Sequence, residues 1–193
     1  CLSQLLAHYD LIIESLQKGL NVDTIYLDFS KAFDKVDHSI VMEKLEMLGI
    51  KGKMNNWIKS FLTDRHQRVI VNGFLSDPVQ VKSGVPQGSV LGPLLFLVLI
   101  SDIDRNVSSH TSSFADDTRL LRAILNAHDC DKLQCDLHTI FQWSKDNNMA
   151  FNNSKFELLR YGPNQVLKDS TSYLRIDGEK IEEKTHVRIS VSP

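Results

Sequence analysis

The sequence predicts an α+β fold in which a mostly antiparallel sheet is covered on one face by helices. Apolar residues recur at helical spacing in several segments, other short segments alternate between apolar and polar residues, and turn-forming residues separate the strand candidates. The predicted order is helix, strand, helices, hairpin, helix, hairpin, helix and hairpin. Strands and helices in this arrangement are typical of an α+β domain.

The first two elements are an amphipathic helix and a strand that carries a carboxylate. Apolar residues recur at helical spacing over residues 2–16, and Gly19 follows as a stop signal. Residues 24–29 alternate, which predicts a strand with Tyr26 and Asp28 on one face. The other face of this strand is apolar and is formed by Ile25, Leu27 and Phe29.

The middle and end of the chain continue with short elements. Asp37 can cap a helix that ends at Gly49, and Asn72-Gly73 predicts a hairpin turn. Residues 94–100 are apolar all round, which predicts a buried helix with Pro93 in or near its first turn. The other predicted elements are helices at 55–62 and 133–141, strands at 68–71, 79–81, 112–115 and 118–121, and a hairpin of 149–151 with 156–161.

Composition is ordinary for a soluble globular domain, with 42% hydrophobic and 24% charged residues and a net charge of −2. Nucleic-acid-binding proteins are usually basic, so the distribution of charge matters more here than its sum. Between residues 51 and 82, six basic residues outnumber two acidic ones. This patch could contact phosphates, and the alternative interpretation is a solvated surface.

Two further observations bear on the compartment. The longest apolar stretch, Val90 to Ile100, is interrupted by Gly92-Pro93 and is too short to span a bilayer, and no signal peptide is recognisable. Three cysteines form no disulfide framework, which is typical of a reducing compartment, and their spacing with nearby histidines matches no known zinc finger or ribbon. We therefore predict an intracellular protein without membrane association.

Two adjacent aspartates, Asp116 and Asp117, lie between short apolar strand candidates. At a tight turn their carboxylates repel each other, and a divalent cation such as Mg²⁺, which prefers hard oxygen ligands, would remove that penalty. Asp28 could complete such a site, and two metal ions bridged by carboxylates suit phosphoryl transfer. The alternative interpretation of the Asp-Asp pair is a solvated turn.

Four motifs then point to one family. Tyr26-Leu-Asp-Phe-Ser-Lys-Ala-Phe-Asp-Lys-Val36 resembles the first palm motif of LINE-type (non-LTR retrotransposon) reverse transcriptases. Ser83-Gly-Val-Pro-Gln-Gly-Ser-Val-Leu-Gly-Pro-Leu-Leu-Phe96 resembles the second motif and Phe114-Ala-Asp-Asp117 the third. Trp143, followed by Asn152-Asn-Ser-Lys155, resembles the fourth. The resemblance covers about residues 1–162 and implies an RNA-directed DNA polymerase of the two-metal type.

The resemblance implies a role for particular residues. Asp28, Asp116 and Asp117 would be the catalytic carboxylates that bind two Mg²⁺ ions, with Mn²⁺ as an alternative. We expect Asp28 and Asp116 on neighbouring strands. Asp34 lies past the strand in the family pattern and would not be a metal ligand. Phe33 would block a ribose 2′-hydroxyl, and its alternative interpretation is a core phenylalanine.

The remaining implied contacts are with substrates. Gln87 and Gly88 match the loop that approaches template and incoming nucleotide, where a glycine allows close backbone approach. Lys155 matches a lysine proposed to protonate the leaving pyrophosphate, and its alternative interpretation is a surface charge. The partners implied are an RNA template, a DNA primer and dNTP, and no stable protein partner is inferred. From the basic patch we assign Arg65, Arg68 and Lys82 to nucleic-acid binding.

The resemblance also predicts a division of the chain. Residues 1–24 would form a helix at the junction of fingers and palm, 25–165 the palm, and 166–193 a hairpin leading towards a thumb. Both ends are interpreted as cut points in a longer polyprotein, with fingers mostly missing and a nuclear location expected for the family. The stretch Lys184-Thr-His-Val-Arg188 departs from the Lys-Asp-Leu-Gly-like pattern usual there.

Three other interpretations are open at this point. The chain could be an inert retrotransposon remnant that at most binds nucleic acid weakly. It could be a Mg²⁺-dependent phosphotransferase or receiver-like domain, which would require parallel strands alternating with helices. A group II intron or telomerase origin is the third, although the motif strings favour a LINE element.

Overall fold

The computed structural model describes residues 2–114 and 116–186, which divide into two compact units. The sheet unit contains the chain up to residue 30, residues 103–145 and the residues from 150 onward. The helical unit contains residues 31–102 and 146–149. The division predicted from the sequence does not contain this boundary. The two units are defined by tertiary contacts, and the chain passes from one unit to the other four times.

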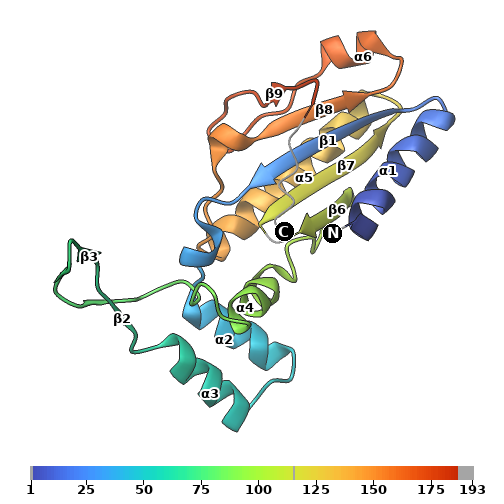
Figure 1. Cartoon of the computed structure of the whole chain (residues 1–193). Helices are drawn as coiled ribbons and strands as arrows, with labels where there is room; N and C mark the ends of the chain where they lie inside the picture. The colour runs from blue at the N-terminus through green and yellow to red at the C-terminus, as the bar shows by residue number, and fades with distance from the viewer. Residues whose placement is uncertain (1, 115, 187–193) are drawn as a thin grey trace. The chain divides into compact units, whose positions relative to one another are not determined.

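The sheet unit is built on five strands in the order β6-β7-β1-β8-β9, with β1 between β7 and β8 (Figure 1). Every pair is antiparallel except β8 with β9, which is parallel and two residues long. The strands are β1 (Asn21–Asp28), β6 (His110–Phe114), β7 (Asp117–Ile124), β8 (Glu157–Tyr161) and β9 (Glu182–Glu183). The antiparallel partners of β1 exclude the parallel sheet of a receiver-like domain.

One face of this sheet is covered by α5 (Ala127–Asp146). Ile25, Leu27 and Phe29 point to this face and are buried, as their alternation predicted. Phe29 lies 6.2 Å from Trp143 of α5, measured between ring centroids. Each such buried large apolar side chain contributes roughly 1.5–3 kcal/mol. The buried residues of α5 are Cys130, Leu133, Asp136, Leu137, Ile140, Phe141 and Ser144.

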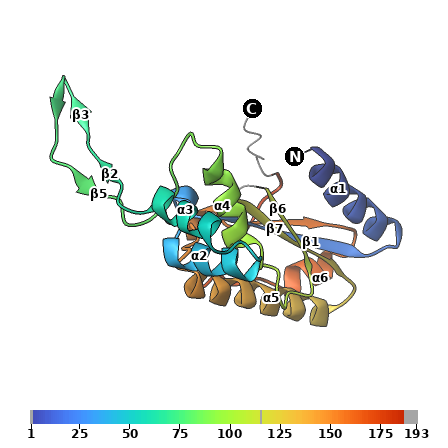
Figure 2. The ribbon, with the colours of Figure 1, turned by 90° about the horizontal axis from the view of Figure 1, so that it is seen from below.

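The other face carries α1 (Leu2–Gln17), so α1 and α5 lie on opposite sides of the sheet (Figure 2). Ile12 packs against Val22 and Leu121, and the His8 ring lies 6.4 Å from that of Tyr26. Burial lowers the pKa of His8 to about 4. The α+β class with an antiparallel sheet is confirmed, and α1 adds a helix on the second face.

The helical unit contains α2 (His38–Met47), α3 (Lys53–Leu62), α4 (Leu91–Ile100) and the short 3₁₀ helix η1 (Ala32–Asp34). Asp37 caps α2 as predicted, accepting hydrogen bonds from the main-chain nitrogens of Ser39 and Ile40. A hairpin extends from α3 and turns at Asn72-Gly73, where both residues have positive φ. The turn is where the sequence predicted a connection, and the strand that follows it at 74–75 was not predicted. Its pairs are β2 (His66–Gln67) with β5 (Val79–Gln80) and β3 (Ile70–Val71) with β4 (Phe74–Leu75).

Two predictions about local structure are wrong. The α4 helix is not buried all round, because Leu94 and Leu97 are 54% and 50% exposed. The predicted hairpin of residues 149–151 with 156–161 does not form. Instead, Phe151 forms an antiparallel bridge with Phe29, the residue after β1, and β8 pairs with β1 itself. Both segments pair with β1 and its continuation, so they do not pair with each other.

The 3₁₀ helix η2 (Asn153–Lys155) joins these two segments. After β8 comes α6 (Gln165–Ser170), which the sequence pattern did not predict. An antiparallel bridge between Leu174 and Lys180 then closes a short hairpin within the predicted 166–193 segment, whose residues 187–193 lie outside the described part. Within residues 2–114 and 116–186, no helix is long and apolar enough to cross a membrane.

Candidate active site

The site begins with two carboxylates at the ends of adjacent strands. In the antiparallel register of β1 and β7, Asp28 is the direct partner of Asp117. Opposed residues in such a pair project to the same face, and like charges placed there destabilise the pairing. That face is opposite to the one covered by α5. The strands therefore bring two negative charges together without any contribution from a loop.

Asp116 adds a third carboxylate from the turn that precedes β7. We expected Asp116 on the strand beside Asp28, but the register partner of Asp28 is Asp117, and Asp116 lies one residue earlier, in the turn. The strand β7 starts at Asp117, one residue before the predicted 118, so it includes Asp117 and leaves Asp116 in the turn. The three residues are nevertheless gathered at one end of the β1–β7 pair.

The pKa of Asp117 shows the electrostatic effect of this grouping. Burial raises the pKa of Asp117 above its ordinary value of 3.8, and the neighbouring carboxylates of Asp116 and Asp28 raise it further. Arg119 and Lys155 act in the opposite direction without reversing the shift. Ionised Asp117 is therefore disfavoured by burial and by two like charges, and a bound cation would relieve both.

Lys155 is the cation in contact with this cluster. Its Nζ donates a hydrogen bond of 2.9 Å to Oδ2 of Asp28. That bond is the main reason that the pKa of Lys155 is raised, and the charges of Asp116 and Asp117 add to it. The main-chain nitrogen of Asn152 donates to the Asp28 carbonyl at 2.8 Å, which ties η2 to the end of β1. Lys155 is thus held beside the carboxylates by local backbone structure.

The fit to Mg²⁺ rests on donor chemistry. Carboxylate oxygens are the ligands that Mg²⁺ prefers, and three aspartates lie at one end of the β1–β7 pair. In the conformation described for residues 2–114 and 116–186, no three carboxylate, imidazole or thiolate groups are already arranged around a single point. The Lys155 ammonium occupies one of the two carboxylate oxygens of Asp28. Metal binding would therefore require these side chains to turn and Lys155 to move away.

The other predicted substrate residues lie in the helical unit. Phe33 follows Ala32 in η1 and is half-buried, with its ring centroid 4.8 Å from that of Phe96. Lys31, just before η1, has a left-handed backbone with φ of 55°. The packing against Phe96 shows that Phe33 contributes to the core of this unit, while half-burial leaves part of its ring accessible.

The loop that carries Gln87 and Gly88 is fastened to the segment after Phe33. The nitrogens of Gly84 and Val85 donate to the carbonyls of Val36 and Phe33 at 2.8 and 2.9 Å. A Cβ on Gly84 would lie 2.7 Å from the Asp34 carbonyl oxygen, so this glycine allows a close backbone approach. Gly88 has φ of 78° and open space around it, so glycine is favoured there by conformation.

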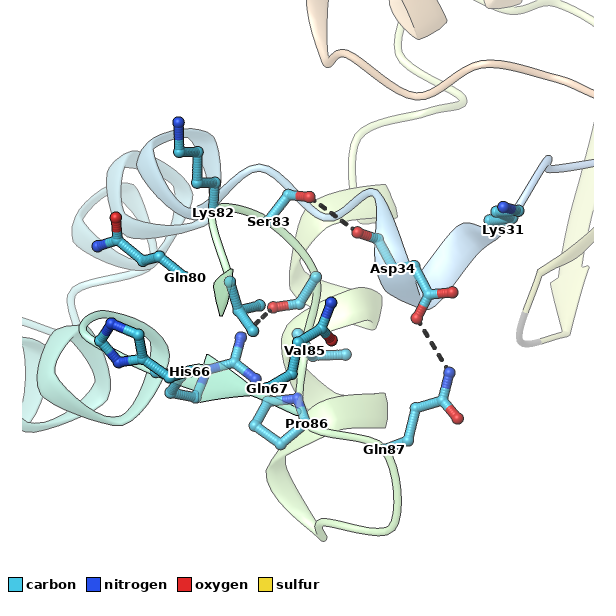
Figure 3. A pocket seen from close by; sticks show the side chains of 13 residues that line it. Lys31, Asp34, His66, Gln67, Gln80, Lys82, Ser83, Val85, Pro86 and Gln87 are labelled. Carbon is cyan, nitrogen blue, oxygen red and sulfur yellow. Dashed lines mark hydrogen bonds between the residues drawn. The ribbon is translucent and has the colours of Figure 1, made fainter. Parts of the chain in front are cut away.

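The three basic residues differ in their surroundings. Arg65 is half-buried and donates from Nε to the Leu62 carbonyl at 2.9 Å and from Nη2 to the Gly84 carbonyl at 2.7 Å. Arg68 and Lys82 are exposed, the first in the hairpin and the second beside the loop. Arg65 and Lys82 line a polar pocket of about 870 Å³ within the helical unit (Figure 3).

Sequence reasoning missed several contacts in this loop. The Gly84 carbonyl also lies 2.8 Å from Nε2 of His38, and Ser83 Oγ donates to the Asp34 carbonyl at 3.0 Å. The Asp34 carboxylate accepts a hydrogen bond from Gln87 (Figure 3). No periodicity signals these pairs, because the partners lie 46 to 53 residues apart in the chain.

Comparison with known proteins decides the family. Residues 13–185 match the model of the family described as "Reverse transcriptase (RNA-dependent DNA polymerase)". The chain belongs to the reverse transcriptase family. The LINE-type resemblance is confirmed by its relatives, which are polymerases of mobile elements.

The RNA-directed DNA polymerase from mobile element jockey of Drosophila melanogaster is 34% identical over 145 residues, covering 67% of this chain and 15% of that protein. The probable polymerase from transposon BS of the same species is 33% identical, covering 69% and 16%. A Pol polyprotein from the R2 element of Popillia japonica is 31% identical over 86 residues, covering 45% and 14%. The chain thus spans about a seventh of the length of these relatives.

A solved telomerase from Candida tropicalis, in complex with a fragment of telomeric RNA, shares the fold of this reverse transcriptase chain. Its TM-score is 0.62 at 14% sequence identity, and the match covers 84% of this chain and 30% of the telomerase. A second telomerase, from Candida albicans, gives a TM-score of 0.60 at 13% identity, covering 86% and 31%. These structures support the fold, and the family assignment rests on the sequence matches.

Proposed function

We propose that this chain carries the catalytic carboxylates of an RNA-directed DNA polymerase that joins dNTP to a primer 3′-hydroxyl. The observation that supports it most is the register pairing of Asp28 with Asp117, with Asp116 in the adjacent turn and the Asp117 pKa raised by burial and by both neighbouring carboxylates. A protein gains nothing in stability from gathering three carboxylates, so their cost is explained by the cation that they would bind.

Asp28, Asp116 and Asp117 would hold two Mg²⁺ ions, or Mn²⁺ in their place. When bound, the ions would activate the primer hydroxyl and neutralise charge on the triphosphate. The contribution of the chain is then mainly positioning and electrostatics. Lys155, already drawn to the cluster by Asp28, is suited to give a proton to the leaving pyrophosphate once its ion pair is released.

Other residues would select and hold the substrates. The partly accessible ring of Phe33 would exclude a ribose 2′-hydroxyl and so favour dNTP over ribonucleotides. Gln87 and Gly88 would meet the template and the incoming nucleotide on a loop whose backbone is fixed by Phe33 and Val36. Exposed Arg68 and Lys82 would bind phosphates of the RNA template or DNA primer, and Arg65 would contribute beside its structural bonds.

Primer extension tests this proposal in the full-length protein that carries the chain. We expect the parent to extend a DNA primer on an RNA template, and Asp116→Asn to abolish extension while the protein stays folded, because Asn keeps the turn geometry but loses the charge. Asp131→Asn is a matched control, since Asp131 is an exposed aspartate on α5. It should extend primers like the parent.

Two results would contradict the proposal. An Asp116→Asn protein that still extends primers would show that the chemistry lies elsewhere. A folded parent that binds the primer and template but does not extend it would favour the inert remnant over the enzyme.

A further inference from the structure

Within the helical unit, hydrogen bonds hold the segment 33–36 and the loop 83–87 together. Besides the two main-chain bonds from Gly84 and Val85, the Ser83 hydroxyl donates to the Asp34 carbonyl at 3.0 Å. The missing side chain of Gly84 lets the two backbones touch at Asp34. This clamp fixes the position of the Asp34 main chain relative to the loop that bears Gln87.

Within this clamp the two side chains also meet. Nε2 of Gln87 donates a hydrogen bond of 3.0 Å to Oδ1 of Asp34 (Figure 3). A carboxylate only accepts hydrogen bonds, whereas an amide has a donor end and an acceptor end. Asp34 can therefore bind only the NH₂ end of Gln87. The Oε1 end is left to accept a hydrogen bond from another molecule.

This orientation matters because an unrestrained glutamine amide can present either end. Rotation by half a turn about its last torsion exchanges donor and acceptor at nearly the same positions. A site that relies on Gln87 would lose specificity for a hydrogen-bond donor if the amide turned over. The Asp34 bond is charge-assisted, and such bonds are stronger than those between neutral groups.

We propose that Asp34 is a positioning residue that holds the Gln87 amide with its carbonyl oxygen free to accept a hydrogen bond from a donor group of the incoming nucleotide or the template base. This inference rests on the proposed polymerase function, and it adds a role for a carboxylate that is not a metal ligand. Asp34 acts through Gln87 and does not itself contact the substrate.

The hydrogen bond between Gln87 and Asp34 can be detected by NMR without an activity assay. In the 193-residue chain labelled with nitrogen-15, the side-chain NH₂ signals of Gln87 should show slow exchange with solvent. Asp34→Asn should change them, because an Asn amide has both a donor and an acceptor end and no longer favours one orientation of Gln87. Unchanged signals in Asp34→Asn would overturn the proposal at its first step.

A double-mutant cycle of Asp34 and Gln87 in the polymerase measures how this hydrogen bond affects the KM for dNTP. Asp34→Asn should raise the KM for dNTP about threefold to tenfold with little change in kcat, the range expected for one hydrogen bond. In a Gln87→Ala background the same change should have almost no effect, because the residue through which Asp34 acts is gone. The melting temperature should stay that of the parent, since Asp34 is exposed and its main-chain bonds remain.

The outcomes separate this inference from the proposed function. If the effects of Asp34→Asn and Gln87→Ala multiply independently, or if Asp34→Asn leaves KM unchanged, the positioning role is wrong while the polymerase function stands. Asp131→Asn provides the baseline for an exposed aspartate. A parent that extends no primer would overturn the proposed function and with it the substrate role of Asp34, and the amide signals would still report the contact.

Discussion

The two ends of strand β1 each carry an aspartate, and the two differ in how their charge is compensated. Asp23 is 3% exposed, accepts a hydrogen bond of 2.6 Å from the Tyr173 hydroxyl and lies 3.5 Å from Nε of Arg160. Asp28 faces Asp117 across the strand pair, and its bound cation is Lys155 at 2.9 Å. One end is a buried network in which the carboxylate meets a phenol and a guanidinium, and the other is a cluster of like charges.

The pKa shifts have different causes at the two ends. Burial raises the pKa of Asp23, and Tyr173 and Arg160 oppose the rise. Burial also raises the pKa of Asp117, but there two neighbouring carboxylates add to it. A carboxylate with its own phenol and guanidinium stabilises a fold, whereas like charges gathered around Asp117 are stabilised by a cation from outside. The comparison therefore separates a structural aspartate from candidate catalytic ones on the same strand.

The largest effect that sharpens this comparison is expected from Asp23→Ala. Removing this carboxylate takes away the acceptor of the Tyr173 hydroxyl and the nearer of the two carboxylates beside the buried Arg160 guanidinium, which costs about 3 kcal/mol of unfolding free energy. Asp28→Ala, on the same strand, should cost less than about 1 kcal/mol or be stabilising, because it relieves repulsion with Asp117. Urea unfolding of the 193-residue chain measures both. Equal losses of unfolding free energy in Asp23→Ala and Asp28→Ala would contradict the distinction between the two ends of β1.

A smaller effect is expected from Phe33→Val, which contrasts with Phe29. Phe29 is 2% exposed and stacks on Phe151 at 4.5 Å, whereas Phe33 is half-buried. In primer extension, Phe33→Val should raise ribonucleotide incorporation relative to deoxyribonucleotide about tenfold, or about 1.4 kcal/mol, because the proposed clash with the 2′-hydroxyl is removed. Phe29→Val should instead lower stability and keep sugar selectivity.

Competition between ribonucleotides and deoxyribonucleotides in primer extension decides the role of Phe33. If Phe33→Val lowers stability with no change in sugar selectivity, Phe33 is a core residue that packs on Phe96, and its assignment as a steric gate is wrong.

The sequence alone predicts much of the carboxylate cluster at the Asp28 end of β1. Alternation put Asp28 on the face opposite to Ile25 and Leu27, and the motifs grouped it with Asp116 and Asp117. Both follow from short-range pattern or family resemblance. The bond from Lys155 to Asp28 joins residues 127 apart, and the bond from Gln87 to Asp34 joins residues 53 apart. Such contacts depend on strand register and loop packing, which local patterns do not contain.

The failed hairpin prediction has the same cause. Residues 149–151 and 156–161 have turn residues between them, and their pattern is equally compatible with pairing to each other or to a third strand. The third strand prevailed because Phe151 can stack on Phe29 while β8 extends along β1. Pairing with a central strand buries more apolar surface than an isolated hairpin does.

The measurement that tests the central claim most directly is thermal unfolding of the 193-residue chain with and without Mg²⁺. If Asp28, Asp116 and Asp117 form a cation site, millimolar Mg²⁺ should raise the melting temperature of the parent through linkage. Asp116→Asn should be at least as stable as the parent without Mg²⁺ and should gain much less from the ion. Na₂SO₄ at equal ionic strength controls for screening.

The raised pKa of Asp117 determines how the stability of the metal-free chain changes with pH. Burial and two neighbouring carboxylates raise the pKa of Asp117, so the cost of ionising Asp117 in the folded chain is absent below the ordinary value of 3.8 and grows as the pH rises from there to the raised value. Metal-free stability falls over that window, and the Mg²⁺ effect is largest above it. We predict stabilisation of the parent by Mg²⁺ at pH 7.5 (about 1 kcal/mol or more at tenfold the dissociation constant). Equal Mg²⁺ responses in parent and Asp116→Asn, or a marked loss of metal-free stability in the variant, would contradict the account.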